Sequence, residues 1–326
     1  MRVILICSFF LLCGCAPTFA PTMEGGMTPM VSDDAIVARD GTRLPLRHWD
    51  AEGQETNKPR AVIVALHGMS DYSNAFDMPG KVWAKRGITT LAFDQRGFGR
   101  SENPGIWAGG DAMRADLNDA VGAARMRYPG VPVFVLGESM GGAVVLTALA
   151  SGAPTRADAS ADAPTLKADG VILVAPAVWS RGDMPPLYRT ALFLGAHLVP
   201  GVILSNQAAG RVVTITPSDN VALLRALGRD PLFQKKTRID TLFGLVNLMD
   251  EARTAPQDIK TAPPILFLYG ANDQVIPAKP TEAVIAWLGN KATVKRYEHG
   301  WHMLLRDLEG ESVDNDVADW IFHKRN

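Results

Sequence analysis

The sequence contains little cysteine, and what it has is confined to one end. Its three cysteines are Cys7, Cys13 and Cys15, all within the first 15 of 326 residues. The rest of the chain has no thiol that could form a disulfide or ligate a metal. No group of histidines and cysteines has the spacing of metal ligands either. We therefore expect no metal, and the serine chemistry described below needs no organic cofactor.

An excess of basic residues and a long apolar run are also missing. The formal net charge is −1, with no basic patch, no G-x-x-x-x-G-K-[ST] motif and no internal repeat. This composition argues against a nucleic-acid partner. The N-terminal apolar run, Val3–Leu12, has ten residues, whereas crossing a bilayer takes roughly 20.

That short run is typical of the apolar region of an export signal. It follows the basic start Met1-Arg2, and Leu12-Cys13-Gly14-Cys15 then resembles a bacterial lipobox. The resemblance implies a lipoprotein signal peptide over residues 1–14 and lipid on the sulfur of Cys15. Because Ala16 rather than Asp follows, it implies an anchor in the outer membrane, on the periplasmic side. The alternative is an ordinary signal peptide cut after Ala20.

The segment Gly137-Glu138-Ser139-Met140-Gly141 carries the strongest chemical signal. The β-rich run Val131–Leu136 precedes it, and the small-residue helical run Gly142–Ala150 follows it. A G-x-S-x-G between a strand and a helix predicts a nucleophile elbow. The alternative is a Gly/Ser turn without chemistry, which the flanking strand and helix disfavour. Ser139 is the predicted nucleophile.

A serine nucleophile needs a histidine base, which in this chain order comes last, after the acid. The histidines after Ser139 include His299 and His302, both in a loop that follows the β-like run 292–297. Position alone does not separate these two. His197 lies in an apolar stretch where a packing role fits better, and His323 is expected on the surface of a terminal helix.

The predicted acid is Asp273. It follows Pro264–Gly270, a buried-strand pattern ended by glycine, and sites in parallel sheets form where strands end. A purely structural Asx-turn is the alternative. Asp94 also ends a strand-like run but precedes the serine, so we expect it to order a loop near Arg96.

Two backbone N–H groups should form the oxyanion hole. One belongs to Met140, after the nucleophile. The other is assigned to Met69, because Ala61–Leu66 reads as a strand that leads into His67-Gly68-Met69. His67 is expected to brace this loop through hydrogen bonds, and not to act as a base.

The alternation of β-like and α-like runs predicts an α/β fold with a mainly parallel sheet and helices on both faces. We expect eight strands. The predicted divisions are a flexible tether over residues 15–33, a core over 34–175 and 264–326, and a helical cap over 176–263. Apolar cap side chains are the predicted acyl-chain contacts: Leu192, Phe193, Leu194 and Phe243. The simpler interpretation is that they pack on the body.

Four segments together resemble the monoacylglycerol lipase and lysophospholipase branch of the α/β-hydrolase superfamily. They are Leu66–Met69, Phe93–Ser101, Gly137–Gly142 and Tyr297–Met303. The last resembles the family's Y-x-x-x-x-H segment, which favours His302 over His299. One departure is Glu138, where family members often have histidine. The resemblance implies an α/β-hydrolase fold and a lipid or other small ester as substrate.

The expected reaction is hydrolysis of a carboxylic ester, monoacylglycerol or lysophospholipid, through an acyl-enzyme. Three alternatives remain open. A short-chain carboxylesterase or an acyltransferase would use the same triad. A non-catalytic binding lipoprotein is disfavoured because Ser139, Asp273 and His302 are all present.

Overall fold

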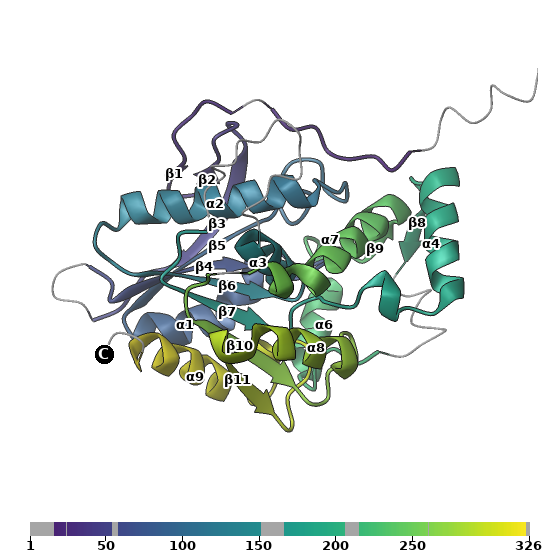
Figure 1. The fold of residues 1–326 in the computed structure, drawn as a ribbon. Coiled ribbons are helices and arrows are strands. Elements are labelled where there is room, and N and C mark those ends of the chain that lie inside the picture. The colour runs from purple at the N-terminus through teal and green to yellow at the C-terminus, as the bar shows by residue number, and fades with distance from the viewer. Residues whose placement is uncertain are drawn as a thin grey trace, which may run out of the picture.

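A single sheet organises the chain in the computed structural model, which describes residues 16–23, 25–53, 58–150, 166–205, 215–259 and 261–323. Within these residues the sheet has nine strands in the order β1-β2-β3-β5-β4-β6-β7-β10-β11 (Figure 1). Their bounds are β1 Met30–Val31, β2 Ala35–Val37, β3 Arg43–Trp49, β4 Ala61–Leu66, β5 Ile88–Phe93, β6 Val133–Glu138, β7 Gly170–Val174, β10 Ile265–Gly270 and β11 Ala292–Tyr297.

The strands from β5 to β11 pair in parallel, whereas β1, β2 and β3 pair antiparallel. Strands β4, β5, β6, β7 and β10 bury every residue. Continuous apolar runs of this kind are typical of parallel strands covered on both faces. The mainly parallel α/β sheet is therefore confirmed, with β1 added to the eight expected strands.

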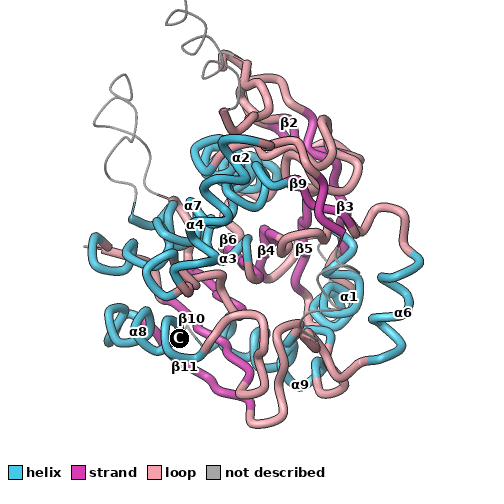
Figure 2. Tube along the Cα trace, turned by 90° about the vertical axis from the view of Figure 1, so that its right-hand side faces the viewer, coloured by secondary structure: helices cyan, strands magenta, loops and turns pink. Residues whose placement is uncertain are grey.

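Helices cover both faces of the sheet (Figure 2). On one face α1 (Asp77–Lys85) packs against α9 (Gly310–His323), and their apolar side chains share a core with β4 and β5. On the other face lie α2 (Gly110–Arg127), α3 (Met140–Ala150) and α8 (Ala278–Leu288), which contribute to a second core. This is the α/β-hydrolase arrangement that the sequence predicted.

Between β7 and β10 the chain forms the elements of the expected cap. They are α4 (Pro186–Leu198), α6 (Val221–Arg229) and α7 (Ile239–Asp258), together with an antiparallel pair, β8 (Ile203–Ser205) and β9 (Lys236–Arg238). Helix α7 packs closely on α3. Helix α4 packs on α7 and buries only Ala196. The β8–β9 pair was not predicted.

Two backbone hydrogen bonds fasten this region to the loops at the sheet edge. The N–H of Gln234 donates to the carbonyl of Ser70 at 2.8 Å, and the N–H of Met303 donates to the carbonyl of Pro217 at 2.9 Å. Residues 216–220 and 230–234 therefore lie against the chain that follows β4 and β11, while α4 lies further away on α7.

The described part of the N-terminal segment packs on the body, a contact that the tether expectation did not include. The N–H of Ala20 donates to the carbonyl of Trp107 at 2.8 Å, and β1 pairs with β2. Cys15 and the predicted signal peptide lie outside the described residues. Among the described helices, none combines the length and apolar character needed to cross a membrane.

Candidate active site

The predicted catalytic residues follow three strands that end at the same edge of the sheet. Ser139 comes directly after β6, Asp273 after β10 and His302 after β11. Because parallel strands present their carboxyl ends at one edge, residues distant in sequence meet there. The structure brings these three side chains together.

Ser139 occupies a tight turn with a φ of +52°, a left-handed conformation that is rare for a residue with a side chain. The turn leaves no room beside it. A Cβ on Gly137 would lie 2.5 Å from the carbonyl oxygen of Gly141, and one on Gly141 would lie 2.3 Å from that of Leu66. Glycine is therefore required on both sides, and the turn aims Ser139 away from the sheet.

A chain of two hydrogen bonds links the serine to a buried carboxylate. The Oγ of Ser139 lies 3.0 Å from Nε2 of His302, and Nδ1 of His302 lies 2.9 Å from Oδ2 of Asp273. The other oxygen of Asp273 accepts the N–H groups of Val275 and Ile276 at 2.8 and 2.9 Å. With Nδ1–H donating to Asp273, Nε2 carries the lone pair that faces the serine proton.

The other histidines do not reach the serine. His299 is exposed, and His323 bonds the carbonyl of Asp319 within its own helix. His197 lies over the ring of Phe193 at 4.2 Å and bonds the carbonyl of that residue. The two candidates that sequence position left open are thus separated by geometry, and His302 is the one beside Ser139.

The loop after β4 passes directly beside the nucleophile. A Cβ on Gly68 would lie 3.2 Å from that of Ser139. His67 is fully buried there; Nδ1–H donates to the carbonyl of Gly68 at 2.8 Å, and Nε2 accepts the N–H of Gln95 at 3.0 Å. Burial lowers the pKa of His67, so the ring is neutral.

The two predicted oxyanion donors lie on either side of Ser139's turn. Met69 is the residue after Gly68 in this loop, and Met140 begins α3. Their oxyanion roles stay a prediction.

A buried ion cluster lies behind the elbow, and two of its three members were not singled out from the sequence. Arg306 bonds Asp71 at 2.8 Å and Glu138 at 3.3 Å. Asp71 belongs to the loop after β4, and Glu138 ends β6. Burial opposes the charge on Arg306, but the two carboxylates outweigh it and raise the pKa of the guanidinium above its usual value.

The comparison with protein families gives the chain a place among known enzymes. Residues 57–309 match the family described as serine aminopeptidase, S33. The chain belongs to this family. The match includes Ser139, Asp273 and His302, so the hydrogen-bonded trio lies within the part that defines membership.

Individual relatives of this S33-family chain extend over nearly its whole length. Monoglyceride lipase of Rattus norvegicus is 27% identical over 89% of this chain and 90% of its own. Monoacylglycerol lipase of Mycolicibacterium smegmatis is 26% identical over 89% and 96%. A solved monoglyceride lipase of Saccharomyces cerevisiae has a TM-score of 0.70 at 18% identity, covering 95% of this chain and 99% of its own, and shows the shared α/β-hydrolase fold.

In this S33-family chain the four predicted acyl contacts differ in how far they are exposed. Leu192 is half-buried against the core, whereas Phe193 and Leu194 are 54% and 48% exposed. Phe243 is half-buried beneath His197, with its ring 5.4 Å from the imidazole and 4.8 Å from the guanidinium of Arg181. The imidazole of His197 thus contacts two phenyl rings, that of Phe193 in α4 and, edge to face, that of Phe243 in α7.

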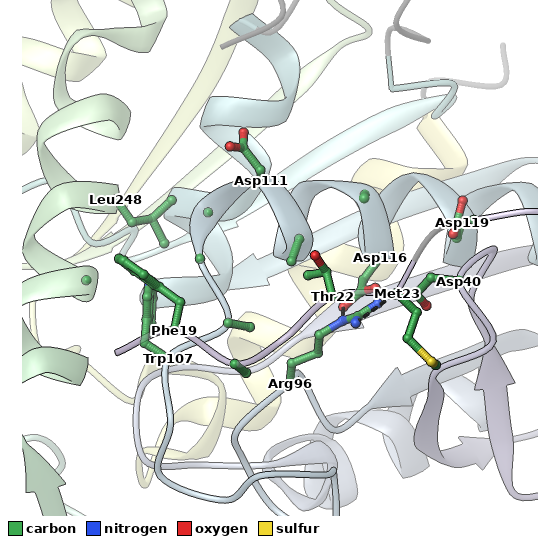
Figure 3. A pocket seen from close by; sticks show the side chains of 18 of the residues that line it. Phe19, Thr22, Met23, Asp40, Arg96, Trp107, Asp111, Asp116, Asp119 and Leu248 are labelled. Atoms are coloured by element: carbon green, nitrogen blue, oxygen red, sulfur yellow. Dashed lines mark hydrogen bonds and ion pairs between the residues drawn. The ribbon is translucent and has the colours of Figure 1, made fainter. Parts of the chain in front are cut away.

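A cavity of about 550 Å³ lies apart from the serine, between the N-terminal segment, the start of α2 and α7 (Figure 3). Arg96 in its wall bonds Asp116 at 2.6 Å and pairs with Asp40 at 2.8 Å. Asp94 does order its loop, by accepting backbone N–H groups that include that of Arg100 at 2.8 Å.

Across the described residues, no group of His, Cys, Asp and Glu is arranged to hold a metal ion.

Proposed function

We propose that this protein is a serine hydrolase that cleaves monoacylglycerol, or the related lysophospholipid, into a fatty acid and an alcohol. The observation that carries the proposal is the hydrogen-bonded chain from Ser139 through His302 to Asp273 on a strained elbow. A serine activated in this way is suited to acyl transfer.

The enzyme class is that of the carboxylic ester hydrolases. Relatives over about nine tenths of the chain are named monoglyceride or monoacylglycerol lipase, and solved structures with this fold include lipases and esterases. The narrower assignment, a monoacyl lipid as the substrate, rests on those relatives' names and on the apolar cap.

The proposed reaction has two acyl-transfer steps. His302 takes the proton of Ser139 through Nε2 while the serine oxygen attacks the ester carbonyl. The backbone N–H groups of Met69 and Met140 stabilise the oxyanion. His302 then protonates the leaving alcohol, and an acyl-serine remains. Water, deprotonated by the same nitrogen, attacks this ester, and the fatty acid leaves with Ser139 restored.

The proposed acyl groove uses Leu192, Phe193, Leu194 and Phe243. Phe193 and Leu194 are large apolar side chains that remain exposed on α4, and a long acyl chain would remove such surface from water. Each buried methylene contributes about 0.8 kcal/mol. Catalytic efficiency should therefore rise with acyl length if this surface holds the chain.

We propose further that Cys15 carries a lipid anchor that holds the enzyme at the periplasmic side of the outer membrane. The support is the pattern Leu12-Cys13-Gly14-Cys15 after a short apolar run. Ala20, five residues after Cys15, already contacts the body. The enzyme would then sit close to the lipid surface.

The test compares wild type with Ser139→Ala, both without the predicted signal peptide (the leaderless protein). The substrates are monooleoylglycerol, lysophosphatidylcholine, p-nitrophenyl esters of two to sixteen carbons and an aminoacyl p-nitroanilide. We expect monooleoylglycerol to be the best substrate. Ser139→Ala should retain its circular dichroism and lose activity on the order of 10⁶-fold.

Each other outcome points to a different function. Turnover of short esters alone would leave a short-chain carboxylesterase, and anilide cleavage would point to a peptidase. A new ester formed in the presence of excess alcohol would indicate an acyltransferase. A folded wild type that turns over none of these substrates would contradict the proposal and favour a binding protein.

A further inference from the structure

We propose that Arg306, with Glu138 and Asp71, is a positioning residue that holds the nucleophile, the histidine loop and the oxyanion loop in register for ester hydrolysis. The inference rests on the proposed function and adds to it a part of the machinery outside the triad. Arg306 touches no reacting atom, so it would act only through the segments that it joins.

The cluster connects three segments that are far apart in sequence. Glu138 directly precedes Ser139, Asp71 lies two residues after Met69, and Arg306 lies four residues after His302. One guanidinium bonds both carboxylates, Nη1 to Asp71 at 2.8 Å and Nη2 to the Glu138 oxygens at 3.3 and 3.4 Å. The elbow, the loop after β4 and the histidine loop thus contribute one member each.

The cluster is almost completely shielded from water. The side chains of Arg306, Asp71 and Glu138 are 4%, 3% and 3% exposed. Buried charges lose their hydration and need close partners, so the removal of one partner from such a cluster disturbs the others strongly. An exposed ion pair would position its neighbours far less firmly, because water competes for both groups.

The neighbouring backbone ties Arg306 to the histidine loop. Its N–H donates to the carbonyl of Met303 at 2.8 Å, and its own carbonyl accepts the side-chain amide of Asn220 at 3.0 Å. The next residue, Asp307, accepts the N–H of Trp301 at 2.7 Å. The residue before His302 and the residue after it are therefore both held by this short stretch.

Charge gives the cluster a second effect on the reaction. Glu138 and Asp71 together carry two negative charges, and Arg306 neutralises one of them. The oxyanion that forms beside Ser139 is also negative, and like charges in a dry site repel strongly. Without Arg306, two buried carboxylates would lie near each other, on the segments of Ser139 and Met69, with no cation between them.

The experiment uses the leaderless protein and the variants Arg306→Gln, Arg306→Lys, Glu138→Gln and the double variant Arg306→Gln/Glu138→Gln. The matched control is Arg114→Gln, since Arg114 is another largely buried arginine that bonds two carboxylates, Asp111 and Glu251. Four quantities are measured: Tm, kcat and KM on a nitrophenyl ester, affinity for an alkyl boronic acid, and the rate of Ser139 labelling by a fluorophosphonate.

We expect Arg306→Gln to lower kcat about 10²-fold, as the loss of an oxyanion-hole donor does, with KM changed less than threefold. Boronic acid affinity and the labelling rate should fall in proportion to kcat, because both depend on a tetrahedral adduct at Ser139. Arg306→Lys should recover part of the loss by keeping the charge. Arg114→Gln should lower Tm and leave kcat unchanged.

The double variant separates a charge effect from lost packing. Removing Glu138 as well as Arg306 leaves one carboxylate, the same net charge as in the wild type, so the double variant should be more active than Arg306→Gln. A purely structural role would make the double variant worse. If Arg306→Gln does not fold, Glu138→Gln and Arg306→Lys give the same comparison of kcat with boronic acid affinity.

Two results would overturn the inference: a folded Arg306→Gln with kcat and boronic acid affinity within threefold of wild type, or a double variant less active than that single one. Failure of the proposed function can be distinguished from failure of this inference. If folded wild type hydrolyses no ester, labelling of Ser139 by the fluorophosphonate still compares the variants without any assumption about the substrate.

Discussion

At the scale of single residues, the nucleophile depends on two glycines beside which there is no room for a Cβ. Ser139 has a left-handed φ of +52°, and the chain on either side passes within van der Waals contact of neighbouring backbone. Such a conformation persists only when surrounding contacts hold it. The glycines of the motif are thus part of the site, although they carry no reactive group.

Gly137→Ala should disrupt the elbow, because its Cβ would lie 2.5 Å from the carbonyl oxygen of Gly141. We expect a loss of about 2–3 kcal/mol in the free energy of unfolding and a large loss of activity. The matched control is Gly122→Ala in α2, where a Cβ meets nothing within 4 Å. That change should stabilise by about 0.5–1 kcal/mol. Urea unfolding measures both, and equal effects would contradict the steric argument.

Asp273→Asn should fold and lose about 10⁴ in kcat. If the amide oxygen keeps the N–H groups of Val275 and Ile276, the amide nitrogen turns its donors toward Nδ1 of His302. The imidazole would then carry its proton on Nε2 and could not accept the serine proton. Steady-state kinetics on a nitrophenyl ester tests this.

His299→Ala should leave kcat unchanged, because His299 does not reach Ser139. If His299→Ala lost as much activity as His302→Ala, His302 would no longer be assigned as the catalytic base.

The residues of the triad could be predicted because each directly follows a strand pattern and lies in a short sequence motif. Arg306 could not be predicted in this way. Its partner Glu138 lies 168 residues away in sequence, and a lone arginine in a loop usually reads as a surface group. The one signal in the local sequence is Glu138 itself. It is a charged residue in a buried motif, at the position where family members often have histidine.

At the scale of elements, the strands of the core were predictable because their apolar runs are long and continuous. Strand β1 was missed because two residues show no periodicity, and it forms only by pairing with β2. The β8–β9 pair has three residues in each strand. Its existence depends on a contact between segments more than 30 residues apart, which no local pattern reveals.

Helix α9 contains a buried carboxyl that should make stability depend on pH. Burial raises the pKa of Asp314 well above its usual value, and its Oδ1 has no hydrogen-bond partner among the described residues. The folded state therefore binds a proton that the unfolded state releases, so this residue's contribution to stability falls as pH rises from about 4 through the raised pKa.

Asp314→Asn removes that titration. We expect the variant to be more stable than wild type by about 1–2 kcal/mol at pH 8 and to show little difference at pH 4. Urea unfolding across this range measures the effect, with exposed Glu309→Gln as control. A stability difference that does not change with pH would show that Asp314 does not titrate in this window.

At the scale of the whole molecule, the proposed lipid anchor should determine where the enzyme is found. In a bacterial host, the full-length chain should fractionate with membranes and incorporate labelled palmitate. Cys15→Ser should lose both, because the proposed lipid is attached to the cysteine sulfur. Cys13→Ser is the matched control and should keep both. Unchanged membrane attachment of Cys15→Ser would contradict the lipobox interpretation.

The hydrogen bonds between the cap region and the loops of the site limit how the enzyme opens. Residues 216–220 and 230–234 are bonded to the backbone of Met303 and Ser70, so a hinge motion of the entire cap would deform both loops. Helix α4 buries only Ala196 and rests on α7. Its own backbone attachments run to α7, through the bonds from Ile239 to Val202 and from Asp240 to Pro200. We therefore predict that α4 moves without straining the loops of the site. A disulfide engineered between α4 and α7 should then slow hydrolysis of a long-chain ester and leave that of a short ester unchanged.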